Sequence, residues 1–233
     1  MALNASLRRA NADLESFAYS VAHDLRSPLR ALSGYSEILA DDYGKVLDEA
    51  GIGYLMKIKD AAIHMGSIID GLLTLSRVSR EQVAFSVVNL SDEAAVIAAD
   101  MVARNPERDV VVKVKPGMTA VADLDLIRIV LQNLLDNAWK FTSQVTGAVI
   151  EVSENDSEFF VRDNGAGFAQ EFKDRLFKPF ERLHDQSVFP GTGIGLATVQ
   201  RVISRHNGGV RASSSPGNGA TFYFTLNAVR GNE

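Results

Sequence analysis

The sequence has no cysteine, which excludes disulfide bonds and thiolate metal sites. It also lacks any apolar run of about 18 residues, so we expect no segment of it to span a membrane. Its first residues have no signal-peptide core. Disorder is disfavoured because 46% of the residues are hydrophobic, and a formal net charge of −5 argues against nucleic-acid binding. We therefore expect a folded cytoplasmic protein with no nucleic-acid partner.

The first third of the sequence carries two helical patterns. Apolar residues recur at steps of three and four from Leu3 to Leu39, a period of about 3.5 that is typical of a coiled-coil seam. The pattern stops in the turn-forming stretch 41–51, and a second heptad-like run extends from Leu55 to Leu72. Two such helices form an antiparallel hairpin. Because one hairpin cannot cover its own seam, we expect two copies to form a four-helix bundle.

Beyond the polar stretch 76–83, strand and helix patterns alternate. We expect a hairpin domain at 1–79, a linker at 80–86 and a second domain at 87–233. Ser91 and Asp123 are the expected N-caps of two helices, and a third helix is expected at about 195–206. Strands are expected at 83–90, 109–115, 148–154, 158–164, 209–215 and 219–227. This mixture predicts an α+β sandwich with helices on one face of a mixed sheet.

The stretch "SVAHDLRSPLR" places a titratable ring on the first helix. His23 lies two positions from Val21 and Leu25, so it points away from the seam. A carboxylate such as Asp24 can accept the proton of an imidazole, and Pro28 removes a helical hydrogen bond and favours a kink. An ordinary surface histidine beside an inert kink is the alternative.

The stretch "LQNLLDNAWKF" carries a polar helix face. Asn133, Asn137 and Lys140 recur at steps of four and three, so they share one side of a helix. Two carboxamides and an ammonium suit Mg²⁺ and a phosphate chain, because magnesium prefers oxygen ligands shared with substrate phosphates. An ordinary solvated face would show the same spacing.

Two glycine-containing stretches follow. In "VRDNGAGF", Asp163 ends an expected buried strand, and Gly165 and Gly167 permit tight turning and close approach to a flat ligand. An acidic residue in this place can accept a hydrogen bond from an exocyclic amine, although an ordinary β-turn would also fit. In "PGTGIGLATVQRVI", glycines lead into an amphipathic helix whose first amides can bind an anion. These glycines are Gly191, Gly193 and Gly195.

The segment between these stretches, "LFKPFERLHDQSVFP", is long and irregular. Its aromatic residues Phe177 and Phe180 and its cations Lys178 and Arg182 are typical of a mobile cover beside a ligand site. A peripheral loop packed by the same aromatics is the alternative.

Together, and in this order, the motifs resemble those of the sensor histidine kinases of two-component systems. "HDLRSPL" is similar to the H-box, "NLLDNAWKF" to the N-box, "DNGAGF" and "GTGIGLA" to the two glycine boxes, and "LFKPFERL" to the F-box. The stretch 16–39 is similar to the phytochrome-like branch. The resemblance covers nearly the whole chain. It implies a dimerisation and phosphoacceptor hairpin followed by a Bergerat-type ATP-binding domain.

The resemblance also implies a role for each motif residue. His23 would attack the γ-phosphate of ATP, with Asp24 as its general base, and the phosphoryl group would pass to an aspartate of a response regulator. Asn137 would hold Mg²⁺ and Asp163 would select adenine. The remaining residues expected to contact nucleotide are Asn133, Lys140, Gly165, Gly167, Phe180, Arg182, Gly191, Thr192, Gly193, Gly195 and Leu196. The sequence would begin partway through a longer helix, with any sensor domain upstream and absent from this chain.

Two other functions remain open. Hydrolytic ATPases with the same nucleotide fold carry a glutamate base where this chain has Asn133, and an amide cannot take a proton from water, so hydrolysis is disfavoured. A phosphotransfer scaffold without kinase activity is disfavoured by the intact Asn137, Asp163 and glycine boxes. Phosphatase activity toward the partner is open as well, because Ser27 stands where such family members carry threonine or asparagine.

Overall fold

The computed structural model describes residues 2–80, 82–156, 158–173, 175–183, 185 and 188–227, with side chains from Ser20 onward except that of His23. The chain divides into two compact units, Met1–Arg77 and Val78–Glu233. Each unit is described by itself.

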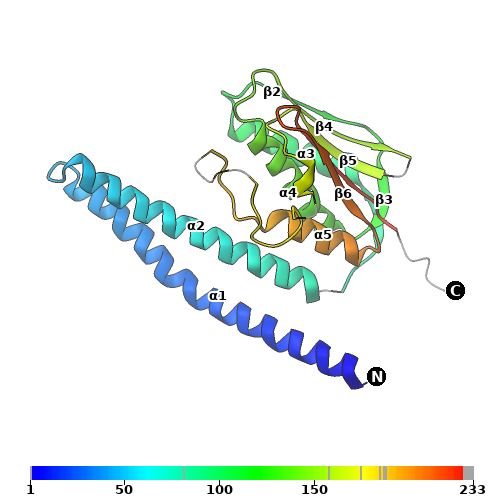
Figure 1. Ribbon diagram of the computed structural model, residues 1–233, viewed down its shortest axis with the longest axis horizontal. Helices are drawn as coiled ribbons and strands as arrows, with labels where there is room; N and C mark the ends of the chain where they lie inside the picture. Colours follow the sequence, from blue (N-terminus) through cyan, green and yellow to red (C-terminus); the bar gives the residue numbers. More distant parts are fainter. Residues whose placement is uncertain are drawn as a thin grey trace. The chain divides into compact units, whose positions relative to one another are not determined.

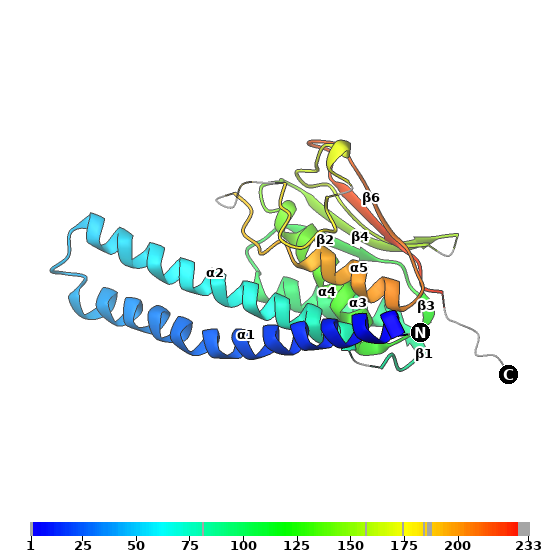
Figure 2. The ribbon, with the colours of Figure 1, turned by 60° about the horizontal axis from the view of Figure 1, so that its bottom comes forward.

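The first unit is a helical hairpin. Helix α1 (Ala2–Tyr43) continues through Pro28, and α2 (Glu49–Arg80) returns beside it (Figures 1 and 2). Arg26 pairs with Asp70, and Lys59 pairs with Glu37 at 2.9 Å, so both ion pairs fit one antiparallel register. Within the described residues, no helix has the length and apolarity that a membrane crossing requires.

Both ends of α2 differ from the sequence-based expectation. The helix begins inside the stretch expected as loop, where the carboxylate of Asp48 accepts a hydrogen bond from the backbone of Gly51 at 2.7 Å. It also continues to Arg80, so the first residues of the polar stretch 76–83 are helical. The polar composition of this stretch did not indicate the end of the helix, because the exposed surface of a helix is polar as well.

The contact between the two helices uses only part of their apolar surface. Ala22, Leu29 and Ser36 are buried at seven-residue intervals on α1, and Ala62 and Ile69 are buried at the same interval on α2. The apolar seam predicted for α1 lies beside this line. Its residues are between 38% and 67% exposed, and they are Val21, Leu25, Leu32, Tyr35 and Leu39. A single copy therefore leaves this seam uncovered.

The second unit is an α+β sandwich, as predicted. Its larger sheet has the strand order β2-β4-β5-β7-β6, in which β2 and β4 are parallel and the other neighbours antiparallel. The strands of this sheet are β2 (Val110–Val114), β4 (Ala148–Asn155), β5 (Glu158–Asp163), β6 (Val210–Ser214) and β7 (Ala220–Phe224). The helices that cover one face of it (Figures 1 and 2) are α3 (Leu90–Arg104), α4 (Leu124–Phe141) and α5 (Gly195–Arg205).

The core lies between the sheet and these helices. Alternate strand residues point into it, such as Ile150 and Val152 on β4, and the apolar face of α4 meets them. The buried residues of this face are Leu126, Ile127, Val130, Leu131, Leu134, Leu135 and Ala138. Because this face of α4 is fixed in the core, its polar face is held in one orientation.

A small second sheet was not predicted. Strand β1 (Ser86–Asn89) pairs antiparallel with β3 (Thr119–Ala122), and the sequence pattern suggested only the first of these strands. The N-cap of α3 also differs from the prediction. Asn89 accepts the first backbone amides of the helix, whereas the Ser91 hydroxyl donates to the carbonyl of Lys115 at 2.6 Å.

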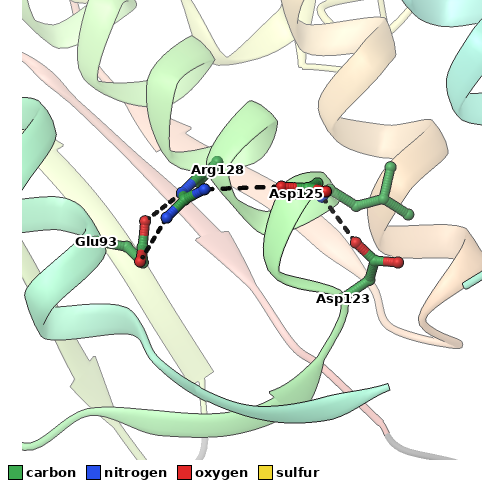
Figure 3. A network of polar contacts seen from close by, with 5 residues as sticks. Glu93, Asp123, Asp125 and Arg128 are labelled. Carbon is green, nitrogen blue, oxygen red and sulfur yellow. Dashed lines mark hydrogen bonds and ion pairs between the residues drawn. The ribbon is translucent and has the colours of Figure 1, made fainter. Parts of the chain in front are cut away.

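The start of α4 is fixed by a polar network (Figure 3). Asp123 is the N-cap, as predicted, and accepts the amide of Leu126 at 3.1 Å. Arg128 joins α4 to α3 through Glu93 at 2.6 Å and contacts Asp125 at 3.7 Å. The backbone amide of Asp123 donates to Nε2 of the fully buried His206 at 3.0 Å. The start of α4 is therefore tied to both neighbouring helices.

Candidate functional site

Asp163 occupies the last position of β5, opposite Ile150 of β4 and Ala220 of β7. Its side chain belongs to the buried face of the strand, and the residue is 4% exposed. Its Oδ1 accepts the backbone amides of Gly165 at 2.8 Å and Ala220 at 3.3 Å. Oδ2 receives no hydrogen bond from the described residues, but it is not sealed from solvent. It is therefore available to a ligand donor.

The environment of Asp163 opposes its ionisation. Burial raises the pKa of this carboxyl to about 6, although the two backbone amides pull in the other direction. Desolvation disfavours the charged form of an acid, so the carboxylate is destabilised until a ligand donates a hydrogen bond to it.

The glycines after β5 are required by close backbone contacts. A Cβ atom at Gly165 would collide with the carbonyl of Phe141, and one at Gly167, where φ is +61°, would collide with that of Ser215. Gly219 has φ of +74° and packs in the same way against the carbonyl of Asp163. Gly219 was not predicted as a site residue, because its only signal in the sequence is its position just before a strand. Glycine is therefore required at these positions, and none of the three places a side chain over the carboxyl of Asp163.

The polar face of α4 carries Asn133, Asn137 and Lys140, all half-buried. Asn133 donates to the carbonyl of Ile129 at 2.7 Å, and a Cβ atom at Gly195 would lie 2.5 Å from its Oδ1. Asn133 therefore lies against the first residue of α5. Asn137 makes no hydrogen bond with the described residues, and its amide atoms are not sealed from solvent. Its oxygen is thus free to bind a ligand.

Two cations converge on Gly191. A Cβ atom at this glycine would lie 3.1 Å from Nζ of Lys140. Arg182 donates hydrogen bonds to the carbonyls of Gly191 and, at 3.0 Å, of Phe189. Burial and, secondarily, the charge of Arg182 lower the pKa of Lys140, while Asp136 acts in the opposite direction. Among the described residues neither cation forms an ion pair with a carboxylate, so this region favours an anionic ligand.

The start of α5 adds backbone donors. The side chain of the N-cap residue, Ile194, makes no capping hydrogen bond, and free amides at a helix N-terminus bind anions. Thr192 accepts the amide of Ile194 at 3.4 Å within the preceding turn, and Leu196 lies half-buried in the first helical turn. The second glycine stretch is therefore placed at a helix start, as predicted.

The segment between the glycine stretches is anchored by aromatic residues. Phe189 is buried and packs on Phe141, with ring centroids 5.1 Å apart, and Phe177 packs against the core. Phe180 is 54% exposed at φ of +66°, and its amide donates to the carbonyl of Gly193 at 3.0 Å. The mobility predicted for this cover stays a prediction.

The H-box residues belong to the helical unit. His23 lies within α1, but its side chain is outside the described residues, so its predicted outward orientation is not tested. Asp24 and Ser27 are exposed on the same helix. The predicted nucleotide residues, by contrast, all belong to the second unit.

Comparison with known families identifies both units. Residues 13–81 match the "His Kinase A (phospho-acceptor) domain". Residues 122–230 match the "Histidine kinase-, DNA gyrase B-, and HSP90-like ATPase" family. A phosphoacceptor hairpin followed by an ATPase domain of this family is the domain arrangement of a class of signalling kinases. The chain belongs to the sensor histidine kinases, of which it is a catalytic core.

Individual relatives agree with this assignment. The chain is 34% identical to cyanobacterial phytochrome B of Nostoc sp. over 97% of this chain and 31% of the relative. It is 28% identical to the aerobic respiration control sensor protein ArcB of Escherichia coli over 96% of this chain and 30% of that one. It therefore spans about a third of the length of these relatives. The crystal structure of full-length ShkA with AMPPNP shares the fold, with a TM-score of 0.65 and 24% identity over 92% of this chain and 47% of ShkA.

Proposed function

We propose that this chain phosphorylates itself on His23 with ATP and then transfers the phosphoryl group to an aspartate of a response regulator. The observation that carries the proposal is the uncompensated charge of the second unit. The buried carboxyl of Asp163 has an acceptor oxygen with no donor, and Lys140 and Arg182 form no ion pair with a carboxylate among the residues that the structure describes. An adenine nucleotide supplies both a donor and an anion.

The nucleotide would be held by groups from several elements. The accessible Oδ2 of Asp163 accepts a hydrogen bond from the exocyclic amine of adenine. Gly165 and Gly167 leave room for the base. Lys140 and Arg182 neutralise the phosphates, and Arg182 also braces the loop at Gly191. The remaining contacts come from Asn133, Phe180, Thr192, Gly193, Gly195 and Leu196.

A magnesium ion fits the donor set. No group of three or more acidic, histidine or cysteine side chains that could hold a metal occurs among the described residues. The free amide oxygen of Asn137 is the kind of ligand Mg²⁺ accepts when phosphates supply the others. Asn137 would hold the ion, with Asn133 supporting it, and the bound ion would neutralise phosphate charge.

The chemistry at His23 needs one proton acceptor. A ring nitrogen forms a bond to the γ-phosphorus while the bond to the β,γ-bridging oxygen breaks, and ADP leaves with that electron pair. Asp24 accepts the ring proton through the other nitrogen. The nitrogen–phosphorus bond then breaks as an aspartate oxygen of the response regulator takes the phosphoryl group. Positioning and charge neutralisation suffice for such transfers.

The functional form would be a homodimer in the cytoplasm, where ATP and response regulators are found. The exposed seam from Val21 to Leu39 is the expected dimer contact, because a second copy would bury it in a four-helix bundle. The longer protein would supply a sensor domain before α1.

Hydrolysis of ATP is the second candidate function. Asn133 disfavours it because its amide, already bonded to Ile129 at 2.7 Å, cannot act as a base toward water.

One experiment separates these functions. The purified chain is incubated with Mg²⁺ and ATP radiolabelled at the γ-phosphate, beside a His23→Gln variant and a His64→Gln control on α2. Acid-labile label on wild type and control, but not on His23→Gln, supports the kinase. Release of phosphate without label supports hydrolysis. Binding of nucleotide with neither product supports a scaffold.

A further inference from the structure

The C-terminal end of α4 is braced by a residue outside the kinase motifs. Arg108 lies in the loop between α3 and β2. Its guanidinium stacks on Trp139 at 4.4 Å from the ring centroid, and its Nη2 donates to the hydroxyl of Thr142 at 2.8 Å. Among the described residues no carboxylate pairs with Arg108. Its charge therefore faces the end of α4, where the helix dipole favours a cation.

Thr142 connects Arg108 to the backbone of α4. Its fully buried hydroxyl donates to the carbonyls of Ala138 at 2.7 Å and Trp139 at 3.1 Å. A hydroxyl has a single hydrogen. The oxygen accepts the hydrogen bond from Arg108, while its hydrogen is directed at the helix carbonyls. Arg108 thus completes the C-cap of α4.

Three parts of the nucleotide site depend on this helix end. Asn137 and Lys140 project from the last two turns of α4. The carbonyl of Phe141 accepts the amide of Ala166 at 3.0 Å, and Gly165 packs closely on the same carbonyl. A shift of the last turn would therefore move the metal ligand, the phosphate ligand and the first glycine stretch together.

We propose that Arg108 is a positioning residue for phosphoryl transfer: by clamping Trp139 and Thr142 it sets the placement of Asn137 and Lys140. The inference rests on the proposed kinase activity. A small misplacement of such groups costs between about tenfold and a hundredfold in rate. We expect Arg108→Gln to lower kcat/KM for Mg-ATP in His23 phosphorylation by about that factor. Arg108→Lys, which keeps the charge but not the planar stack, should recover part of it.

Arg211→Gln is the matched control. Arg211 also stacks on an aromatic ring, that of Tyr223 at 3.6 Å, and binds Glu158 at 2.9 Å, but it lies on β6. The kinetic constants are measured per folded molecule, well below each variant's melting temperature. Fluorescence of Trp139, the single tryptophan, monitors the stack and should change in Arg108→Gln but not in Arg211→Gln.

The outcomes are distinct. Wild type without label or ATP binding would refute the proposed function. Labelled wild type with unchanged kcat and KM in Arg108→Gln, whatever its melting temperature, would overturn the positioning role and leave the function intact. Should Arg108→Gln fail to fold, Arg108→Lys decides: unchanged kinetic constants overturn the inference, and a reduced kcat/KM supports it.

Discussion

Replacing Asp163 with asparagine should stabilise the empty protein at neutral pH while abolishing nucleotide binding. The folded state raises the pKa of Asp163 from 3.8 to about 6. Its proton is therefore held more tightly in the folded than in the unfolded chain, and stability falls as pH rises through this interval. The contribution is fully present below pH 4 and lost above about pH 6.

The size of the effect follows from the same pKa. One pH unit corresponds to about 1.4 kcal/mol, so ionising the residue in the folded state costs about 3 kcal/mol. An asparagine avoids this cost, and its oxygen can still accept the amides of Gly165 and Ala220. The melting temperature of Asp163→Asn, relative to wild type, should rise by about 6–12 °C between pH 4 and pH 7.5.

The assay is thermal unfolding followed by circular dichroism at several pH values. Asp156→Asn, in the exposed turn between β4 and β5, controls for the loss of one negative charge. Nucleotide affinity of the wild type should fall as pH drops below about 6, because the protonated acid is a poorer acceptor. A difference in melting temperature between Asp163→Asn and wild type that stays constant from pH 4 to pH 7.5 would refute this reasoning.

The remaining predictions concern packing and assembly. His206→Ala should lower the unfolding free energy by about 2–4 kcal/mol in urea denaturation, since it leaves a cavity and an unpaired buried amide; an unchanged midpoint would contradict this. Gly219→Ala should prevent folding because its Cβ would collide with a backbone carbonyl, whereas Gly217→Ala, with similar φ but open space, should cost about 1 kcal/mol; equal effects on soluble yield would refute the distinction. Leu32→Glu should convert the dimer to a monomer in size-exclusion chromatography with light scattering, and a persisting dimer would exclude the exposed seam as the interface.

The sequence predicted features that are encoded locally. The two helices of the first unit, the hairpin of β4 and β5, and the N-cap Asp123 are encoded in short segments, and the structure confirms them. Strand β3 was missed because four residues carry too little alternation to be recognised. Ser91 was mistaken for an N-cap because its hydroxyl is used by a residue 24 positions away, Lys115. No local pattern contains that partner.

The sequence indicated residues for the candidate site, whose roles stay predictions, but it did not indicate how they are arranged. Motif spacing indicated that Asn133, Asn137 and Lys140 share one helix face. It did not indicate that Arg182, about forty residues further along the chain, lies near Lys140. The brace from Arg108 joins a loop to the end of a helix in the same way. Such contacts join segments that the fold brings together, and no pattern within a short stretch of sequence records them.

The electrostatics of the empty site suggest why this arrangement suits a nucleotide. Burial disfavours the charged forms of Asp163 and Lys140 in the folded state without ligand, and the nearby charge of Arg182 adds to this for Lys140. A bound nucleotide would relieve both, because an adenine amine would donate to the carboxylate and the phosphates would neutralise the cations. Part of the favourable free energy of binding would thus come from removing unfavourable electrostatic interactions that the empty protein already contains. Asp163→Asn and Lys140→Gln should therefore raise the stability of the empty protein while weakening nucleotide binding, whereas Arg108→Gln should weaken catalysis with no such gain.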